Sequence, residues 1–420
     1  MNINETLSYI HSVSWMGSRP GLSRTRELLH LMGDPQNKLR FVHVAGTNGK
    51  GSTCSMTASI LQAAGYRVGL YTSPYILRFN ERMKVDGVDI SDEELSEITE
   101  YVKPFAESMA EHPTEFELVT AIGFEFFYRR RCDVVVLEVG LGGELDSTNV
   151  IEPPLLSVIT EIDFDHTGVL GNTIAEIASA KAGIIKAGGS VLYCGNDARA
   201  RDVIKEKADQ MHASMYDADK STLTLTRCDL SGCEFDFGDW KGVELSLLGL
   251  YQPENAANVL RAVEILRKEG MEIPESAVYA GLKAARWQAR FEKIVQDPLV
   301  IFDGAHNPEG IDAAVQSVKY YFGTEKVVVL TGIMRDKDYE YVATRLSEIA
   351  KRAFCIKPDN PRALDAEEYA RVLACRGVES SAHGSVQDAF AKAKAFALES
   401  GSVLVCLGSL YMYEQICKLV

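Results

Sequence analysis

The sequence contains no hydrophobic run long enough to cross a membrane. A bilayer span needs ~20 consecutive apolar residues, and no stretch of this chain approaches that length. The first residues, Met1–Glu5, do not have the pattern of a signal peptide. We therefore expect a cytoplasmic protein with no membrane partner.

Cysteine offers little that could build a covalent or metal-bound framework. The nine cysteines are scattered, no C-x-x-C pair occurs, and the closest two, Cys228 and Cys233, lie in a strand-like stretch. This spacing predicts neither a metal site nor a disulfide framework. We expect reduced, mostly buried thiols, as is usual in the cytosol.

Positive charge is also sparse, because 44 Lys and Arg residues stand against 59 Asp and Glu residues, a formal net charge of −15. No basic stripe offsets this balance, so nucleic acid is not expected as a partner. A small anionic substrate needs only local positive charge and stays compatible with it. The 420 residues, 46% of them hydrophobic, suffice for two or three domains with cores of their own.

The most informative segment is a glycine-rich turn between an apolar run and a helical pattern, GTNGKGS at 46–52. Backbone N–H groups of such a turn and of the helix that follows point at a phosphate. Lys50 adds a mobile positive charge, and Ser52 adds a hydroxyl for a phosphate or its Mg²⁺. Gly51 separates the two, so the spacing departs from G-x-x-x-x-G-K-[ST]. The segment predicts a nucleotide site.

Short apolar runs alternate with helical patterns over most of the chain. Runs at 41–45, 68–72, 133–139, 155–160 and 190–194 are typical of buried parallel strands. They predict a doubly wound α/β domain with the phosphate loop after an early strand.

A β excursion and a second α/β alternation follow. Residues 221–248 predict antiparallel strands, and helices are predicted near 254–270 and 275–286. From residue 299 strand and helix patterns alternate again without a second phosphate loop. We expect an N-terminal domain of residues 1–288 and a smaller α/β domain of residues 289–420.

Acidic residues follow two of the predicted strands. Glu138 ends an apolar run, and an acid beside a phosphate loop is well placed to hold Mg²⁺; a solvated acid at a strand end is the alternative. Asp163-Phe164-Asp165-His166 follows the run 155–160 and offers carboxylates and an imidazole. The preceding segment lacks the lysine of the [NT]-K-x-D motif, which weakens an interpretation as a guanine-nucleotide switch.

Together these motifs resemble the Mur ligase superfamily, and within it the folylpolyglutamate synthases, which in many bacteria are also dihydrofolate synthases. The resemblance covers nearly the whole chain. Its motifs are, in chain order, GTNGKGS at 46–52, YTSP at 71–74, NER at 80–82, LEVGLGG at 137–143, LDSTN at 145–149, DHT at 165–167, KAGIIK at 181–186, Q-x-x-NAA at 252–257, RFE at 290–292, DGAHNP at 303–308, DKD at 336–338 and GSLY at 408–411.

The resemblance implies an ATP-dependent ligase with ATP, L-glutamate and a reduced folate or dihydropteroate as substrates. ATP would phosphorylate a carboxylate, and the amine of glutamate would displace phosphate to form an amide. Two Mg²⁺ ions are implied as cofactors. In relatives the lysine that matches Lys181 is carbamylated, which makes it a carboxylate-like metal ligand. A monomer is expected.

The resemblance also assigns the residues of each subsite. The implied ATP contacts are Thr47, Asn48, Gly49, Lys50, Gly51, Ser52, Asn255, Arg290 and Asp303. The implied metal ligands are Ser73, Glu138, His166 and the carbamate of Lys181. The folate side is matched by Thr114, Phe116, Leu145, Asp146 and Ser147, and the glutamate side by His306 and Ser409. The expected catalytic residues are Lys50, Lys181, Asp303 and His306.

Four places depart from the family pattern: Tyr75, Glu144, Ala180 and the pair Gln288-Ala289 before Arg290. Tyr75 and Glu144 fall near the folate side. Folylpolyglutamate synthesis alone is one alternative function. A ligase of cell-wall precursors is another, but such enzymes place a UDP-binding domain ahead of the phosphate loop, and 45 residues precede Gly46, which is short for a domain. A nucleotide switch without ligase activity would explain the loop but neither Asp303 nor His306.

Overall fold

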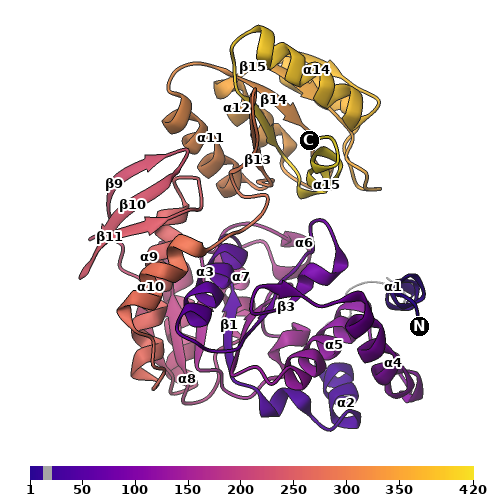
Figure 1. Cartoon of the computed structure of the whole chain (residues 1–420), viewed down its shortest axis with the longest axis vertical. Coiled ribbons are helices and arrows are strands. Elements are labelled where there is room, and N and C mark those ends of the chain that lie inside the picture. Colours follow the sequence, from indigo (N-terminus) through magenta and orange to yellow (C-terminus); the bar gives the residue numbers. More distant parts are fainter. Residues whose placement is uncertain (13–20) are drawn as a thin grey trace. The chain divides into compact units, whose positions relative to one another are not determined.

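The computed structural model describes residues 1–12 and 21–420, and they divide into two compact units (Figure 1). Unit 1 comprises Met1–Thr222 and Asn255–Ala285, and unit 2 comprises Leu223–Glu254 and Arg286–Val420. The chain passes from unit 1 to unit 2 for the last time between Ala285 and Arg286, close to the division predicted at residue 288. The predicted antiparallel excursion is grouped with the second unit rather than with the first.

Unit 1 is built on an eight-stranded sheet of order β4-β3-β2-β5-β1-β6-β7-β8. Its strands are β1 (Phe41–Ala45), β2 (Val68–Tyr71), β3 (Met83–Val85), β4 (Val88–Asp89), β5 (Val134–Glu138), β6 (Leu156–Ile159), β7 (Ser190–Tyr193) and β8 (Ser214–Asp217). The six strands β2, β5, β1, β6, β7 and β8 pair in parallel, in that order across the sheet. The strands β3 and β4 add an antiparallel edge next to β2. Every residue of β1 is buried, as expected of a parallel strand covered on both faces.

The helices of unit 1 surround this sheet. They are α1 (Ile3–Ser12), α2 (Ser23–Leu31), α3 (Lys50–Ala63), α4 (Asp92–Ser108), α5 (Glu115–Arg129), α6 (Thr167–Leu170), α7 (Ile174–Ala182), α8 (Ala198–Gln210), α9 (Gln252–Lys268, from residue 255 on) and α10 (Glu275–Ala284), with 3₁₀ turns η1 (Pro35–Lys38), η2 (Phe79–Arg82) and η3 (Ser147–Val150). Ser91 accepts the N–H of Glu94 ahead of α4, the capping contact that the sequence predicted. Helix α3 packs against α10 (Figure 1).

Unit 2 contains a mixed six-stranded sheet and an antiparallel three-stranded sheet. The larger has the order β12-β13-β17-β14-β15-β16, and the smaller the order β11-β10-β9. The strands are β9 (Thr224–Asp229), β10 (Gly232–Phe237), β11 (Trp240–Leu245), β12 (Glu292–Gln296), β13 (Leu299–Asp303), β14 (Val327–Thr331), β15 (Ala350–Cys355), β16 (Glu379–Ala382) and β17 (Leu404–Leu407). The helices are α11 (Pro308–Phe322), α12 (Tyr339–Ile349), α13 (Ala366–Ala374), α14 (Val386–Glu399) and α15 (Tyr413–Cys417), with the 3₁₀ turn η4 (Leu410–Met412).

The predicted buried strands of the first domain are confirmed as β1, β2, β5, β6 and β7. The strands β3, β4, β8, β12 and β16, at or near the edges of the two larger sheets, were not predicted. The strand β16 has the sequence Glu-Ser-Ser-Ala and only partly buried or exposed residues, so it carries no apolar run. An edge strand pairs through its backbone on one side, and its side chains need not be hydrophobic. Among the described residues, no helix has the length and hydropathy to span a bilayer.

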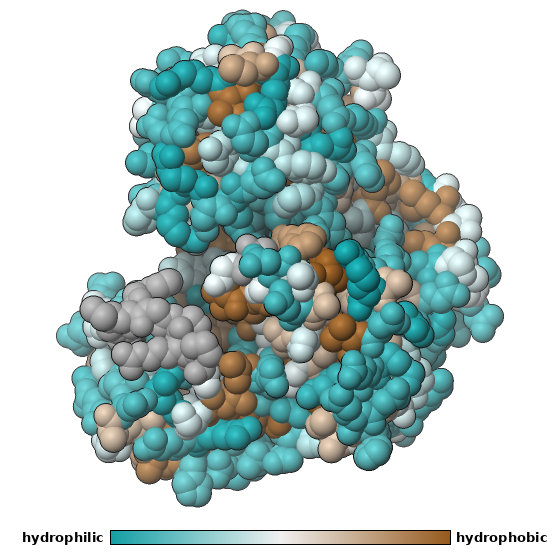
Figure 2. All heavy atoms as spheres, turned by 180° about the vertical axis from the view of Figure 1, so that it is seen from behind, coloured by the Kyte–Doolittle hydropathy of each residue, from teal (hydrophilic) through white to brown (hydrophobic). Residues whose placement is uncertain are grey.

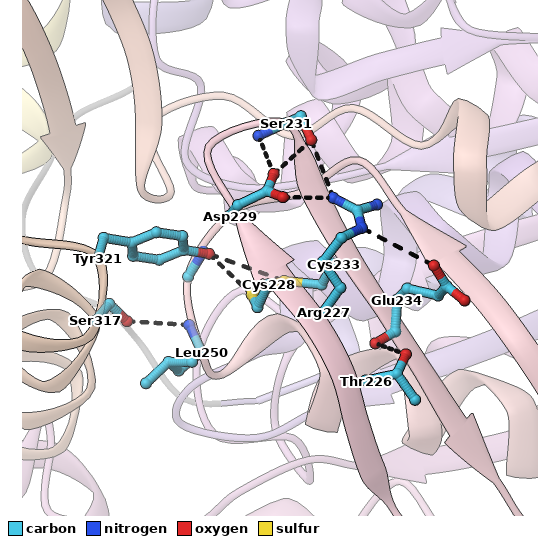
Figure 3. The surroundings of a disulfide bond; sticks show 11 residues. Thr226, Arg227, Cys228, Asp229, Ser231, Cys233, Glu234, Leu250, Ser317 and Tyr321 are labelled. Carbon is cyan, nitrogen blue, oxygen red and sulfur yellow. Dashed lines mark hydrogen bonds and ion pairs between the residues drawn. A yellow bond between two sulfur atoms is a disulfide. The ribbon is translucent and has the colours of Figure 1, made fainter.

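The prediction that all cysteines are reduced thiols is wrong for one pair. Cys228 and Cys233 form a disulfide between β9 and β10 (Figure 3). The two residues face each other directly in the antiparallel register, which places their side chains on the same face of the sheet. The separation of the cysteines in sequence does not reveal this register. Five of the other described cysteines are buried free thiols, as expected: Cys54, Cys132, Cys194, Cys355 and Cys406.

Candidate active site

The phosphate loop joins the central strand of unit 1 to a helix. Strand β1 ends and α3 begins on either side of residues 46–49. Gly46 and Gly49 have φ values of +148° and +83°, a region that favours glycine. A Cβ atom on Gly46 would lie 1.7 Å from Oγ1 of Thr160, and one on Gly49 would lie 2.7 Å from Oδ1 of Asn255. Both positions therefore require glycine, and Asn255 lies against the loop that it is predicted to assist.

The segment that follows β6 holds this loop in place. The Thr47 N–H donates to the carbonyl oxygen of Glu161 at 2.7 Å, and the Thr47 hydroxyl donates to the carbonyl oxygen of Asp163 at 3.1 Å. The hydroxyl of Thr160 donates to the carbonyl oxygen of Asn48 at 2.7 Å. Side-chain and backbone bonds from one neighbouring segment thus fix the loop before a ligand arrives, which lowers the cost of binding.

Two lysines converge on one carbonyl oxygen of the loop. Lys50 donates from Nζ to the oxygen of Gly46 at 3.0 Å and to that of Thr47 at 3.1 Å. Lys181 reaches the same Gly46 oxygen at 2.8 Å from helix α7. Lys181 is 3% exposed, although its sequence context is that of a lysine on a helix face. The structure therefore brings two of the predicted catalytic residues together.

Burial changes the acid–base chemistry of Lys181. Desolvation, together with repulsion from Lys50, lowers the pKa of Lys181 from 10.5 to about 7, while Asp165 and Asp146 act in the opposite direction. About half of such amines are neutral at pH 7, compared with roughly one in 3000 at the ordinary pKa. A neutral amine is the form that reacts with CO₂, so this environment suits the predicted carbamylation.

Glu138 and Ser73 lie together at the carboxyl end of β5. Glu138 is 4% exposed, and its Oε2 accepts the N–H of Ser73 at 3.0 Å. A buried carboxylate beside a phosphate loop suits a hard cation that prefers oxygen ligands. Over the ranges 1–12 and 21–420, no three His, Cys, Asp or Glu side chains gather as a metal site.

His166, the other protein ligand predicted for the metal, is placed differently. It has a positive φ of 51°, and its side chain is 53% exposed, with Nε2 3.8 Å from Oδ2 of Asp165. Asp165 is the neighbour that acts electrostatically on Lys181. The structure thus pairs Ser73 with Glu138, and it sets His166 beside a carboxylate near Lys181.

In unit 2 the predicted residues follow the carboxyl ends of two adjacent parallel strands, β13 and β17. Asp303 ends β13 and is 2% exposed, and Ser409 follows β17 and is 3% exposed. Arg290 lies against the next residue, Gly304, where a Cβ atom would be 2.7 Å from Nη1 of the arginine. Burial raises the pKa of Asp303, and the Arg290 charge lowers it in opposition.

His306 is oriented by a backbone carbonyl. Its Nδ1 lies 2.8 Å from the oxygen of Gly304, which can only accept a hydrogen bond. Nδ1 therefore carries the proton in the neutral ring, and the lone pair is on Nε2. An imidazole held in this tautomer can accept a proton at Nε2.

Comparison with known proteins decides the family. The Mur ligase middle domain model matches residues 44–265, and the model described as Mur ligase, glutamate ligase domain matches residues 289–410. The dihydrofolate synthase/folylpolyglutamate synthase of Bacillus subtilis is 38% identical and aligns over 98% of this chain and 97% of its own. The folylpolyglutamate synthase of Lacticaseibacillus casei is also 38% identical, with the same coverage.

The chain belongs to the Mur ligase family. Among solved structures, the Mycobacterium tuberculosis folylpolyglutamate synthase complexed with ADP and AMPPCP has a TM-score of 0.91 at 28% identity, covering 99% of this chain and 98% of its own. An Escherichia coli enzyme in complex with DHPP and ADP has a TM-score of 0.89 at 28% identity, covering 100% and 97%. As a member of this family, the chain is an ATP-dependent ligase.

The residues predicted for the folate side of this ligase gather around a glycine-rich loop. Phe116 lies on Gly140, where a Cβ atom would be 2.4 Å from Cζ of the ring. Thr114 is the N-cap of α5 in a capping box with Glu117, so its side chain has a structural role as well. Leu145, another of these residues, is 52% exposed. One face of the molecule shows apolar patches among hydrophilic side chains (Figure 2).

Asp146 is held by a buried chain of hydrogen bonds. Its Oδ1 accepts the hydroxyl of Thr148 at 2.5 Å, and its Oδ2 accepts the N–H of Leu141 at 2.8 Å. Because that hydroxyl spends its only proton on Asp146, the bond of 2.9 Å between Thr148 and Nε2 of His43 must be donated by the histidine. Burial lowers the pKa of His43 to about 3, so the ring is a neutral, permanent donor at ordinary pH.

The departures Glu144 and Ala180 lie in contact with each other. The N–H of Glu144 donates to the carbonyl oxygen of Ala180 at 2.7 Å, and a Cβ atom on Gly183 would lie 2.2 Å from Cβ of Glu144. The folate-side loop is thus tied to the helix that carries Lys181. The hydrogen bond joins backbone atoms only, so it does not depend on which side chain stands at 144.

Sequence reasoning missed two residues that hold predicted site residues. Thr160, which packs on Gly46, follows β6. In the sequence this segment was noted only because it lacks the lysine of the [NT]-K-x-D motif. Tyr251 donates its hydroxyl to Oδ2 of Asp303 at 2.6 Å. It directly precedes the motif at 252–257, and that adjacency was the available signal.

Proposed function

We propose that this chain ligates L-glutamate to folates, extending tetrahydrofolate polyglutamates, and also to dihydropteroate to make dihydrofolate. The observation that carries the proposal is the convergence of Lys50 and the buried Lys181 on the phosphate loop at Gly46. The names of the relatives support the choice of substrates, since the name of the Bacillus subtilis enzyme contains both activities. Folylpolyglutamate synthesis alone is the second candidate, favoured by the name of the Lacticaseibacillus casei relative.

In the first step a carboxylate oxygen of the pteroate or folate attacks the γ-phosphorus of ATP. The bond from that phosphorus to the bridging oxygen breaks, ADP leaves, and an acyl phosphate forms. We propose that backbone N–H groups at the start of α3 and the ammonium of Lys50 offset the charge on the transferring group. The N–H of Thr47 already donates to the oxygen of Glu161. Asn255, Arg290 and Asp303 are proposed to hold the nucleotide.

In the second step the glutamate amine attacks the acyl carbon, and the bond from that carbon to the phosphate oxygen breaks. The incoming ammonium must lose a proton before it can attack. Nε2 of His306 is proposed to take part in that proton transfer or to bind the glutamate. Ser409, which follows the adjacent strand β17, is proposed to bind the glutamate as well. We propose that residues 1–288 carry the phosphate loop and the folate side, and that residues 289–420 carry the glutamate side and contribute Arg290 and Asp303 to the nucleotide.

The proposed cofactor is Mg²⁺, as two ions. The fit rests on Glu138, a buried carboxylate at the carboxyl end of β5 that accepts the N–H of Ser73. Carboxylate oxygens are ligands that Mg²⁺ favours. Ser73, Glu138, His166 and a carbamylated Lys181 would hold the ions, which would neutralise phosphate charge during transfer.

The proposed function is tested by following radiolabelled glutamate into product with ATP and either dihydropteroate or tetrahydrofolate. Incorporation with both substrates is expected. Incorporation with tetrahydrofolate alone would assign folylpolyglutamate synthesis only. ATP hydrolysis with no acceptor modified would contradict the proposal and favour a nucleotide switch, and reaction only with a UDP-linked precursor would assign a cell-wall ligase.

Replacing Glu138 with glutamine should abolish turnover at ordinary Mg²⁺ concentration. The amide keeps the shape and can still accept from Ser73, but it lacks the charge that binds the cation, so part of the activity should return at high Mg²⁺. Initial rates across a Mg²⁺ titration measure this effect. ATP-dependent ligation that survives EDTA would show that the metal assignment is wrong.

A further inference from the structure

Tyr251 is built into the second unit so that its hydroxyl meets one oxygen of Asp303. Two residues of α11 hold the turn that precedes it: the N–H of Gly249 donates to the hydroxyl of Tyr321 at 3.2 Å, and the N–H of Leu250 donates to Oγ of Ser317 at 3.0 Å (Figure 3). With its backbone anchored on a helix, Tyr251 has little freedom at the turn.

The ring of Tyr251 is confined as well. Gly249 has a φ of +100°, and a Cβ atom there would lie 2.9 Å from Cε1 of the Tyr251 ring and 3.2 Å from Cβ of Phe291. Phe291 is fully buried and stacks on Tyr321, with ring centroids 5.2 Å apart. The missing side chain at Gly249 thus makes the room in which the tyrosine ring lies.

The two carboxylate oxygens of Asp303 accept different numbers of hydrogen bonds. Oδ2 accepts the Tyr251 hydroxyl at 2.6 Å and the N–H of Phe291 at 2.9 Å, which occupy both of its lone pairs. Oδ1 accepts the N–H of Ala305 at 2.8 Å. Among the described residues, Oδ1 therefore keeps one acceptor position for a donor on a ligand.

We propose that Tyr251 is a positioning residue for the nucleotide: its hydroxyl fixes the Asp303 carboxylate so that Oδ1 is presented to the ligand. The inference rests on the proposed function, in which Asp303 contacts ATP. It goes beyond that assignment, because Tyr251 acts through Asp303 and need not touch the substrate.

The charges around the pair support this role. Burial raises the pKa of Asp303, and Arg290, the Tyr251 hydroxyl and the two backbone N–H groups lower it in opposition. Burial and the Asp303 charge raise the pKa of Tyr251, with smaller effects from Arg290 and Tyr321, so the hydroxyl keeps its proton. Losing this donor would make the carboxylate easier to protonate.

The test compares Tyr251→Phe with Tyr341→Phe. Tyr341 also donates to a carboxylate of unit 2, that of Asp312 at 2.8 Å, but it lies on α12 and neither residue is among the predicted site residues. Tyr251→Phe should weaken AMPPCP binding and lower kcat/KM for ATP about tenfold to a hundredfold, the effect of losing a bond to a charged group. The KM for glutamate should not change, and Tyr341→Phe should behave as wild type.

Two further readouts separate positioning from a structural effect. The acidic limb of the pH profile of kcat/KM for ATP should move to higher pH in Tyr251→Phe, because protonated Asp303 accepts less well. In an Asp303→Asn background, Tyr251→Phe should cost much less in AMPPCP affinity, since the two residues act as a unit. Costs that simply add, or wild-type affinity in Tyr251→Phe, would overturn the inference.

The same measurements distinguish the inference from the proposed function. If the wild type binds AMPPCP but ligates glutamate to no folate, the proposed function fails, and the affinities still decide the role of Tyr251. If the wild type ligates and Tyr251→Phe matches it at every pH, the inference alone fails. A wild type that binds no AMPPCP would overturn both.

Discussion

Replacing Lys50 with alanine is expected to lower glutamate ligation by about a hundredfold to a thousandfold, the scale seen when one donor to a developing charge is lost. Lys50 is the side-chain cation of the phosphate loop itself, and its Nζ lies within 3.1 Å of two loop carbonyl oxygens. From there it can swing to a phosphate. Initial rates at saturating ATP and glutamate measure the loss.

The fold should persist in this variant, because Lys50 is only partly buried and the loop keeps its bonds from Thr47 and Thr160. Circular dichroism and thermal unfolding should match the wild type. Lys205→Ala is the matched control, since Lys205 is an exposed lysine on α8 that pairs with Asp209. Near-normal turnover in a folded Lys50→Ala protein would refute the assignment of the phosphate loop.

Removing Lys181 should be nearly as damaging to the reaction. Its carbamate would place two anionic oxygens near Mg²⁺, whereas an unmodified ammonium would repel the metal. We expect Lys181→Ala to be almost inactive and a short carboxylic acid such as acetate to restore some activity by filling the vacated space. Rates with and without the acid measure this rescue, and Lys205→Ala should show neither loss nor rescue.

The modification itself can be observed. ¹³C NMR of the intact protein after labelling with ¹³CO₂ should show a carbamate signal that is absent from Lys181→Ala. Mass spectrometry in acid would miss it, because carbamates decompose there. An unmodified Lys181 side chain in a metal- and nucleotide-bound structure, or full activity in Lys181→Ala, would rule out the carbamate.

Thermal unfolding should show whether a Lys181 variant is inactive because it lacks the carbamate or because it is misfolded. The folded-state pKa of Lys181, about 7, lies below its ordinary value of 10.5, so the unfolded chain binds the proton more tightly. Stability is therefore lowered below pH 7 and rises as the pH increases from about 7 to about 10.5, by about 4 kcal/mol in all. Lys181→Met in bicarbonate-free buffer should unfold at or above the wild-type temperature at pH 7, although it is inactive. Marked destabilisation would contradict this account.

Much of the fold was predictable because its signals are local. The run 41–45, the glycines at 46 and 49 and the lysine at 50 specify strand, turn and helix by periodicity and by the backbone freedom of glycine. The capping serine at 91 marked the start of α4 in the same way. Edge strands such as β16 escaped prediction, because they form from backbone pairing and carry no hydrophobic pattern.

Part of the site was likewise readable from the sequence, though only as a set of separate motifs. Glu138 ends an apolar run and Asp303 ends another, so each could be placed at the carboxyl end of a strand. Which motifs meet was not readable from spacing. Lys181 and Gly46 are 135 positions apart, and their contact depends on how α7 packs on the sheet.

The amino-acid sequence by itself determined that this protein has a phosphate loop after a buried strand, two α/β sheets and acids at strand ends, because those properties follow from residue type and local spacing. Only the tertiary structure decided that Lys181 is buried on the loop with a pKa near neutrality, that Cys228 and Cys233 are paired, and that Tyr251 holds Asp303. The reason is physical: desolvation, strand register and hydrogen bonding over 52 positions arise from which distant segments pack together, and no local pattern records that packing.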